Sequence, residues 1–220
     1  MYIQITTRCN MECNHCCYSC GPKTGSHMGM STYKKALKLC ENYGETPFLG
    51  GGEPTVHPKF WEFLGLALAT EGGMGDGQLA LITNGKRTRD ALALATLAKR
   101  GVLSVELSVD SFHEEIDEKV VNAFNRPAPK PWGGTDNDLR GTRIGADRTV
   151  YPAGRGVDCA TVDKGCVCPE MLIDPEGRIW ACGCKTKQLG TVDKPEIPSD
   201  IETGNCWAER EVEADLVEAE

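Results

Sequence analysis

The sequence lacks several features that mark common classes of protein. No stretch approaches the roughly 18 apolar residues of a membrane-spanning helix, so we expect no membrane association. The formal net charge of −8 argues against a general nucleic-acid binder, because phosphate backbones are bound by basic surfaces. Neither a phosphate-binding P-loop nor a Ser-His-Asp arrangement is apparent. These absences favour a soluble protein that binds neither nucleic acid nor membrane.

A secretory signal is also missing at the start, where Met1 leads straight into an apolar stretch without a basic region or a cleavage site. We therefore expect a cytoplasmic protein. Cysteine, in contrast, is abundant, with 12 in 220 residues. In the cytoplasm, cysteines stay reduced and serve as metal ligands more often than they form disulfides. A hydrophobic content of 40% is enough to bury the core of one domain with a small appendage.

Short apolar runs alternate with helical periodicity in the first half, a pattern typical of βα units and a parallel sheet. Helices should follow each of the first four strands, and residues 125–140 predict an irregular loop. The strands are expected at 2–7, 47–49, 79–82 and 102–109, with a fifth supplied by 142–146 and 148–151.

Local signals give further detail on the helices. Ser31 is expected to cap the first helix and Gly44 to end it, with Cys40 in the core. The aromatic residues of the second helix, including Trp61, are also assigned to the core. Ser111–Glu114 has the spacing of a capping box for the fourth helix. We assign the histidines at 27, 57 and 113 structural roles.

Cys9, Cys13 and Cys16 form a Cys-x3-Cys-x2-Cys run directly after the first predicted strand. Four thiolates close a [4Fe–4S] cluster, so a three-cysteine loop leaves one iron open to a ligand that is not protein. A zinc site is the alternative, because a Cys-x2-Cys pair with a third thiolate or His15 can bind zinc tetrahedrally.

Polar and glycine-rich motifs follow the next three predicted strands. Gly50–Pro54 follows the second strand, Thr83–Gly85 the third, and Ser108 and Asp110 the fourth. In parallel βα barrels, the carboxyl ends of the strands surround one mouth. One site could therefore gather all four motifs.

Together these motifs resemble the radical S-adenosylmethionine (SAM) enzymes in the first 115 or so residues. The resemblance implies a [4Fe–4S] cluster on Cys9, Cys13 and Cys16, and SAM bound at its open iron. It also implies an α/β fold with a partial, open βα TIM-like barrel. Further cofactor contacts are implied for His15 near the adenine, for Gly51, Gly52 and Glu53 at the methionyl ammonium group, and for Thr83, Asn84, Ser108 and Asp110 at the carboxylate or ribose.

A second cysteine-rich region begins near residue 151, after a radical SAM domain assigned to 1–150. Residues 173–179 predict a β-hairpin with cysteines on both sides. This resembles the SPASM and twitch extensions of radical enzymes, which implies an auxiliary [4Fe–4S] cluster in 151–220, ahead of a C-terminal helix. A zinc knot is the alternative. The candidate ligands are Cys159, Cys166, Cys168, Cys182 and Cys184, and Cys206 is a further cysteine of the same region.

The resemblance implies reductive cleavage of SAM to a 5′-deoxyadenosyl radical that removes a hydrogen atom from a substrate. By analogy we expect a peptide or protein substrate and an electron donor such as a flavodoxin or ferredoxin. A noncatalytic iron–sulfur electron carrier or a zinc-stabilised interaction module would explain the cysteines equally well. Neither alternative would explain why the motifs recur at successive strand ends.

Overall fold

The computed structural model describes residues 1–70, 79–125, 141–145, 150–161 and 170–199, which form an α/β fold around one sheet. The strand order is β5-β4-β3-β2-β1-β6-β7-β8-β9. Neighbours from β5 to β6 are parallel, and those from β6 to β9 are antiparallel. The two edges, β5 and β9, do not pair with each other. Within the described residues the sheet is therefore an open, partial barrel, as predicted.

The strands are β1 (Tyr2–Thr6), β2 (Phe48–Gly51), β3 (Ala80–Thr83), β4 (Ser104–Ser108), β5 (Gly141–Gly145), β6 (Leu172–Ile173), β7 (Arg178–Trp180), β8 (Gln188–Thr191) and β9 (Lys194–Pro195). The helices are α1 (Met30–Tyr43), α2 (Phe60–Ala69), α3 (Thr88–Lys99) and α4 (Glu118–Asn125), with short 3-10 turns η1 (Pro54–Val56) and η2 (Gly154–Cys159).

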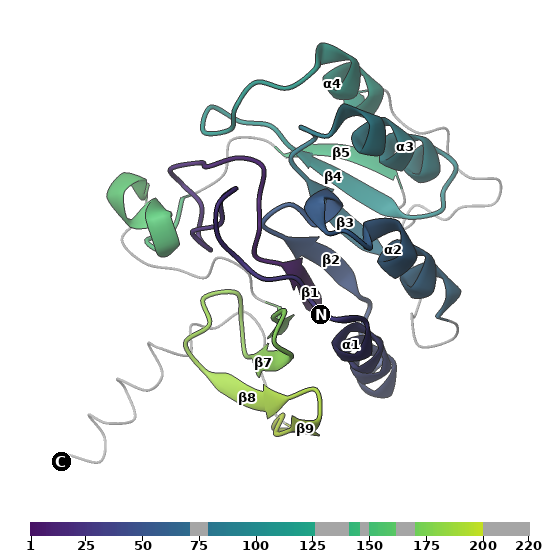
Figure 1. Ribbon diagram of the computed structural model, residues 1–220, viewed down its shortest axis with the longest axis vertical. Coiled ribbons are helices and arrows are strands. Elements are labelled where there is room, and N and C mark those ends of the chain that lie inside the picture. The colour runs from purple at the N-terminus through teal and green to yellow at the C-terminus, as the bar shows by residue number, and fades with distance from the viewer. Residues whose placement is uncertain (71–78, 126–140, 146–149, 162–169, 200–220) are drawn as a thin grey trace.

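Alternate residues of the central strands face the helices. The in-register neighbours Ile3, Leu49, Leu81 and Val105 are at most 1% exposed and belong to the hydrophobic core. Figure 1 shows α1 to α4 along one side of the sheet and the loop after β1 on the other. Because strand side chains alternate, the residues between the core positions face the side without these helices.

The first helix differs from the prediction only at its start. It begins at Met30 after Gly29, and no side chain caps it, so the assignment of Ser31 as the cap is wrong. A serine within the first turn has helical backbone and cannot take the cap conformation. Gly44 ends the helix with φ 64°, and Cys40 is buried, both as predicted.

Two expectations for the later helices are wrong. Trp61 is 43% exposed, because it lies on the solvent side of α2 and donates from Nε1 to Asp90 (3.1 Å). Ser111–Glu114 does not cap α4, which begins at Glu118. Instead, Asp117 accepts a hydrogen bond from the backbone N–H of Lys119 (2.9 Å), which is the bond of an N-cap residue.

The fifth strand and the hairpin are confirmed. β5 pairs in parallel with β4 along five residues, whereas the described residues Val150 and Tyr151 belong to no strand. The hairpin of β6 and β7 extends the same sheet, because β6 pairs in parallel with β1. The predicted C-terminal helix lies outside the described residues, as does the loop predicted at 125–140 apart from Asn125, which ends α4.

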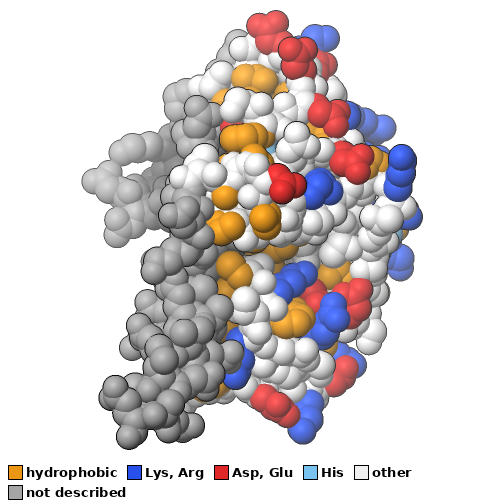
Figure 2. Space-filling view, turned by 90° about the vertical axis from the view of Figure 1, so that its left-hand side faces the viewer, with side chains coloured by type: hydrophobic (Ala, Val, Ile, Leu, Met, Phe, Trp, Pro, Cys, Tyr) orange, Lys and Arg blue, Asp and Glu red, His pale blue; other side chains and the backbone are white. Residues whose placement is uncertain are grey.

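On the side of the molecule opposite the helices, charged side chains of both signs are interspersed toward one margin. Figure 2 shows no large basic area among the described residues of this face, in keeping with the acidic composition. The helices in the described ranges are too short or too polar to cross a membrane.

Candidate functional site

The loop after β1 carries Cys9, Cys13 and Cys16, all partly exposed. The backbone N–H of Cys16 donates to the carbonyl of Cys13 (3.3 Å), so the chain turns between these two residues. Two of the sulfurs accept backbone hydrogen bonds, Cys9 Sγ from Met11 (3.4 Å) and Cys16 Sγ from Cys20 (3.3 Å). Donation of N–H groups to sulfur is the environment that stabilises thiolate ligands.

The three thiols interact electrostatically. Burial, together with the charges of Glu53, Cys13 and Cys16, raises the pKa of Cys9 to about 11. Burial also raises the pKa of Cys13. The pKa of Cys16 is lowered to about 6, chiefly by hydrogen bonding from Cys20. Repulsion among three clustered thiolates disappears when they share a cation, so this donor set fits a metal or an iron–sulfur cluster.

Arg155 in η2 is hydrogen-bonded to this loop, although the two are far apart in the sequence. Its Nε donates to the carbonyl of Cys13 (3.0 Å), its Nη2 to that of Cys20 (2.6 Å), and its backbone N–H to that of Cys16 (3.0 Å). Gly154 has φ 56°, and a Cβ there would overlap the carbonyl oxygen of Cys17. Only glycine fits this approach. Sequence reasoning missed Arg155, because no local pattern marks a contact so distant in the sequence.

Gly51, the last residue of β2, and Gly52 after it let this end of the strand lie close to the end of β1. The backbone N–H of Gly52 donates to the carbonyl of Thr6 (2.8 Å), and that of Glu53 donates to the carbonyl of Arg8 (2.9 Å). A Cβ at Gly51 or Gly52 would overlap the same carbonyl oxygens. The lack of a side chain at these glycines therefore lets the two strand ends approach closely.

Glu53 is buried and its carboxylate connects the ends of β2 and β3. Oε1 accepts from the hydroxyls of Thr55 (2.6 Å) and Thr83 (2.8 Å) and from the Thr55 N–H (3.1 Å). Oε2 accepts from the Asn84 N–H (2.7 Å). Burial raises the pKa of Glu53, although these four bonds oppose the shift. An oxygen of a carboxylate has two lone pairs, so Oε2 retains capacity for another donor.

Asn84 connects the end of β3 with the cysteine loop. Its Nδ2 lies 2.9 Å from Asn10 Oδ1 and 3.5 Å from Cys9 Sγ. With Glu53, it brings the predicted site residues of the first three strands together. Because the side chains of Thr83 and Asn84 are bonded within the protein, their contacts with a cofactor stay predictions.

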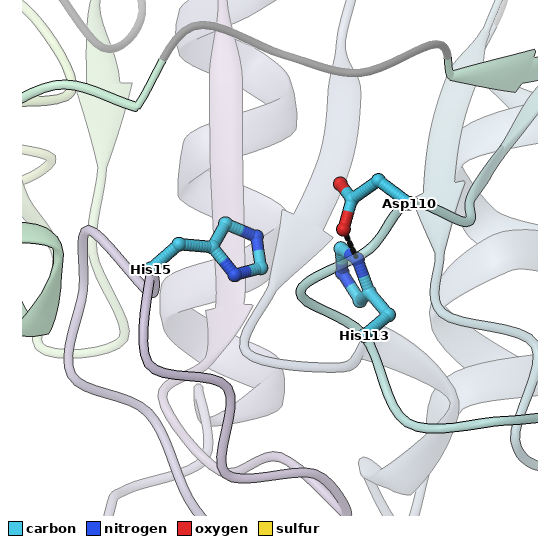
Figure 3. Close-up of side chains that lie close together, drawn as sticks. All are labelled: His15, Asp110 and His113. Carbon is cyan, nitrogen blue, oxygen red and sulfur yellow. Dashed lines mark hydrogen bonds and ion pairs between the residues drawn. The ribbon is translucent and has the colours of Figure 1, made fainter. Parts of the chain in front are cut away.

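His15, Asp110 and His113 come together from the cysteine loop and the segment after β4 (Figure 3). Asp110 Oδ1 accepts from His113 Nδ1 (2.7 Å) and from the Phe112 N–H (2.9 Å). Burial opposes ionisation of Asp110, but these bonds lower its pKa overall. The ring of His15 lies 4.8 Å from that of His113 and 5.0 Å from that of Phe112. Ser108 is the last residue of β4, two positions earlier.

This cluster offers three possible metal-ligand atoms within 4.8 Å of one another. A metal ion would compete with the hydrogen bond between Asp110 and His113, which already satisfies that pair. We therefore interpret the cluster as a wall of the site. The side chain of His113 is 14% exposed and hydrogen-bonded to Asp110, which agrees with the structural role expected for it. His57 has the structural role expected, with Nε2 3.0 Å from the carbonyl of Met28.

The extension contributes described cysteines at three positions. Cys182 is buried, and Cys159 and Cys184 are partly exposed. The remaining predicted positions, Cys166, Cys168 and Cys206, lie outside the described residues.

The chain is similar to several known proteins. A family model described as the radical SAM superfamily matches residues 3–129. The chain is 31% identical over 121 residues to the mycofactocin maturase MftC of Mycobacterium ulcerans, covering 54% of the chain and 31% of the maturase. It is 30% identical over 117 residues to the antilisterial bacteriocin subtilosin biosynthesis protein AlbA of Bacillus subtilis, covering 52% of the chain and 25% of that protein. The chain thus spans about a third of the length of MftC and a quarter of AlbA.

A solved structure shares the fold. The structure of BtrN in complex with AdoMet and 2-DOIA superposes with a TM-score of 0.57 at 16% identity, covering 87% of the chain and 77% of BtrN. At this identity the likeness concerns the fold alone.

Proposed function

Because the chain belongs to the radical SAM superfamily, we propose that it starts a radical reaction with a [4Fe–4S] cluster and S-adenosylmethionine. When bound and reduced, the cluster supplies the electron that splits SAM into methionine and a 5′-deoxyadenosyl radical, which removes a hydrogen atom from the substrate. The proposal rests on one observation. The three-cysteine loop and the ends of β2 and β3 meet at the same edge of the sheet.

Cys9, Cys13 and Cys16 would hold the cluster and leave one coordination position open. Asn84 Nδ2, close to Cys9 Sγ, would stabilise negative charge on that sulfur. Arg155 would keep the loop in shape through its bonds to the carbonyls of Cys13 and Cys20. Each of these contacts comes from a different segment, which supports a preorganised site.

The ends of β2 and β4 would bind the rest of the cofactor. The free capacity of Glu53 Oε2 supports its assignment, with Gly51 and Gly52, to the methionyl ammonium group. His15, Ser108 and Asp110 would contact the adenosine part. Thr83 and Asn84 would contribute mainly by fixing Glu53 and the cysteine loop.

The substrate class we propose is a peptide or protein side chain. The names of two relatives, a maturase and a bacteriocin biosynthesis protein, support a peptide. We assign 151–220 to an auxiliary [4Fe–4S] region with ligands drawn from Cys159, Cys166, Cys168, Cys182 and Cys184. A flavodoxin or ferredoxin of the cytoplasm would supply the electron.

The test is anaerobic. The chain is reconstituted with iron and sulfide and given SAM and a strong reductant, and 5′-deoxyadenosine is quantified. We expect product from the native chain and from Cys17→Ala, a neighbour outside the triplet, and none from Cys13→Ala. An iron-loaded native chain that forms no 5′-deoxyadenosine, with or without candidate peptides, would contradict the proposal. Uptake of zinc in place of iron would support the interaction module instead.

A further inference from the structure

Gln4 lies on β1 and is fully buried, yet the NH2 group of its side-chain amide forms no hydrogen bond with the described residues. Its neighbours Ile3 and Ile5 belong to the core, so Gln4 faces the side of the sheet without the helices. Its Oε1 accepts a hydrogen bond from Lys185 Nζ (2.6 Å). This contact orients the amide, because oxygen must face the ammonium group. Its Nε2 is buried with no hydrogen-bond partner among the described residues.

Lys185 lies in the connection between β7 and β8, where its backbone has φ 57°, an uncommon value for a residue other than glycine. Its ammonium group is 5.4 Å from the centre of the Tyr18 ring, which belongs to the cysteine loop. Among the described residues it forms no ion pair with a carboxylate. An ammonium group has three donors, and Gln4 takes one of them.

The two side chains therefore present only donors, and one of them is charged. Buried donors in folded proteins are almost always paired, so this pair is suited to an acceptor that the chain does not provide. A carboxylate matches best, since its two oxygens can accept from the ammonium and the amide together. Tyr18 places the pair beside the loop that carries Cys16 and Cys20.

We propose that Gln4 and Lys185 form a subsite for a carboxylate of the substrate, between the cysteine loop and the extension. The occupant would be an acidic side chain or the C-terminus of a peptide. The assignment to substrate rests on the proposed function, whereas the carboxylate site itself does not. SAM also has a carboxylate, so the test must separate the two sources.

Two small probes differ only in the group of interest. N-acetylglycine has a carboxylate, and N-acetylglycinamide has a neutral amide in its place. Their binding to the iron-loaded full-length chain is measured by ligand-observed NMR of the acetyl methyl group. We expect N-acetylglycine to bind about tenfold more tightly than the amide, the effect of one hydrogen bond to a charged group.

Variants locate the binding. Gln4→Glu keeps an acceptor for Lys185 but removes the amide donors, and Lys185→Met removes the charge. Each should weaken N-acetylglycine binding about tenfold. Lys187→Met, an equal charge change in the same connection, should not. If Gln4→Glu fails to load iron, Lys185→Met still decides. Equal binding of the two probes, or an equal effect of Lys187→Met, would overturn the proposal.

The titration is repeated with saturating SAM. N-acetylglycine that still binds at Gln4 and Lys185 supports a substrate subsite. Displacement of the probe, with about tenfold weaker SAM binding in Lys185→Met, would assign the pair to the cofactor and overturn the substrate assignment. Binding needs no turnover. A chain that binds the probe but forms no 5′-deoxyadenosine would therefore refute the proposed function and leave the carboxylate site standing.

Discussion

The loop after β1 and the connection after β7 both carry cysteines, but they are held by different means. The first is fixed by bonds to distant segments, including Arg155 and the end of β2. The turn of the second is held by local bonds to the buried carboxylate of Asp174, and its hairpin joins the sheet through the pairing of β6 with β1. The first loop should therefore depend on the integrity of the whole sheet, and the hairpin turn mainly on Asp174.

The largest effect should follow Glu53→Ala, which removes the acceptor of four hydrogen bonds, two from Thr55 and two from the end of β3. We expect the free energy of unfolding to fall by about 4 kcal/mol, because buried donors are left unpaired. Urea denaturation of the reduced, metal-free chain, followed by circular dichroism, measures it. Glu62→Ala is the matched control, with a side chain 56% exposed and an expected change within about 0.5 kcal/mol. Similar losses in both variants would show that Glu53 does not join the strands.

A smaller, local effect should follow Asp174→Asn in the hairpin. The Asp174 carboxylate accepts from the Arg178 N–H (3.0 Å), Arg178 Nε (2.7 Å) and Trp180 Nε1 (2.9 Å). Loss of its charge should cost about 2 kcal/mol of local stability. Hydrogen exchange should accelerate in β7 and β8 but not in β3 and β4, and the exposed Asp193→Asn should leave both unchanged. Acceleration throughout the sheet would contradict the independence of the two regions.

The smallest expected effect concerns Arg155→Met, which leaves the carbonyls of Cys13 and Cys20 without their shared donor. Iron should pass to a chelator about tenfold faster, as is typical when a residue that supports metal ligands is lost. Arg155→Lys should give an intermediate rate, because lysine keeps the charge but lacks the planar fork. Iron release at the native rate in Arg155→Met would show that the loop holds its shape alone.

The sequence was sufficient where one local signal decided the structure. The apolar runs located the first four strands, Gly44 ended α1 in the left-handed region, and the order of motifs predicted which strand ends lie together. The predicted capping box failed because Asp110 and Asp117 compete for the same segment. Asp110 takes the Phe112 N–H, and Asp117 starts the helix.

Contacts between distant segments were beyond prediction. Arg155 is one of many charged residues in sequence, and only the fold brings it to the cysteine loop. Gln4 and Lys185 likewise meet because β6 adds to the sheet next to β1. Whether the side chain of Trp61 is buried or exposed depended on which face of α2 meets the sheet. In each case, tertiary packing supplied information that residue type and spacing do not contain.

The central claim is that the loop after β1 holds a cluster with one iron open to SAM. The most direct measurement is the electron paramagnetic resonance spectrum of the reduced, iron-loaded Cys182→Ala/Cys184→Ala variant, before and after SAM is added. In this variant we expect iron only at the first loop. The account predicts a spectrum that changes shape with SAM. A cluster signal that SAM leaves unaltered would contradict it.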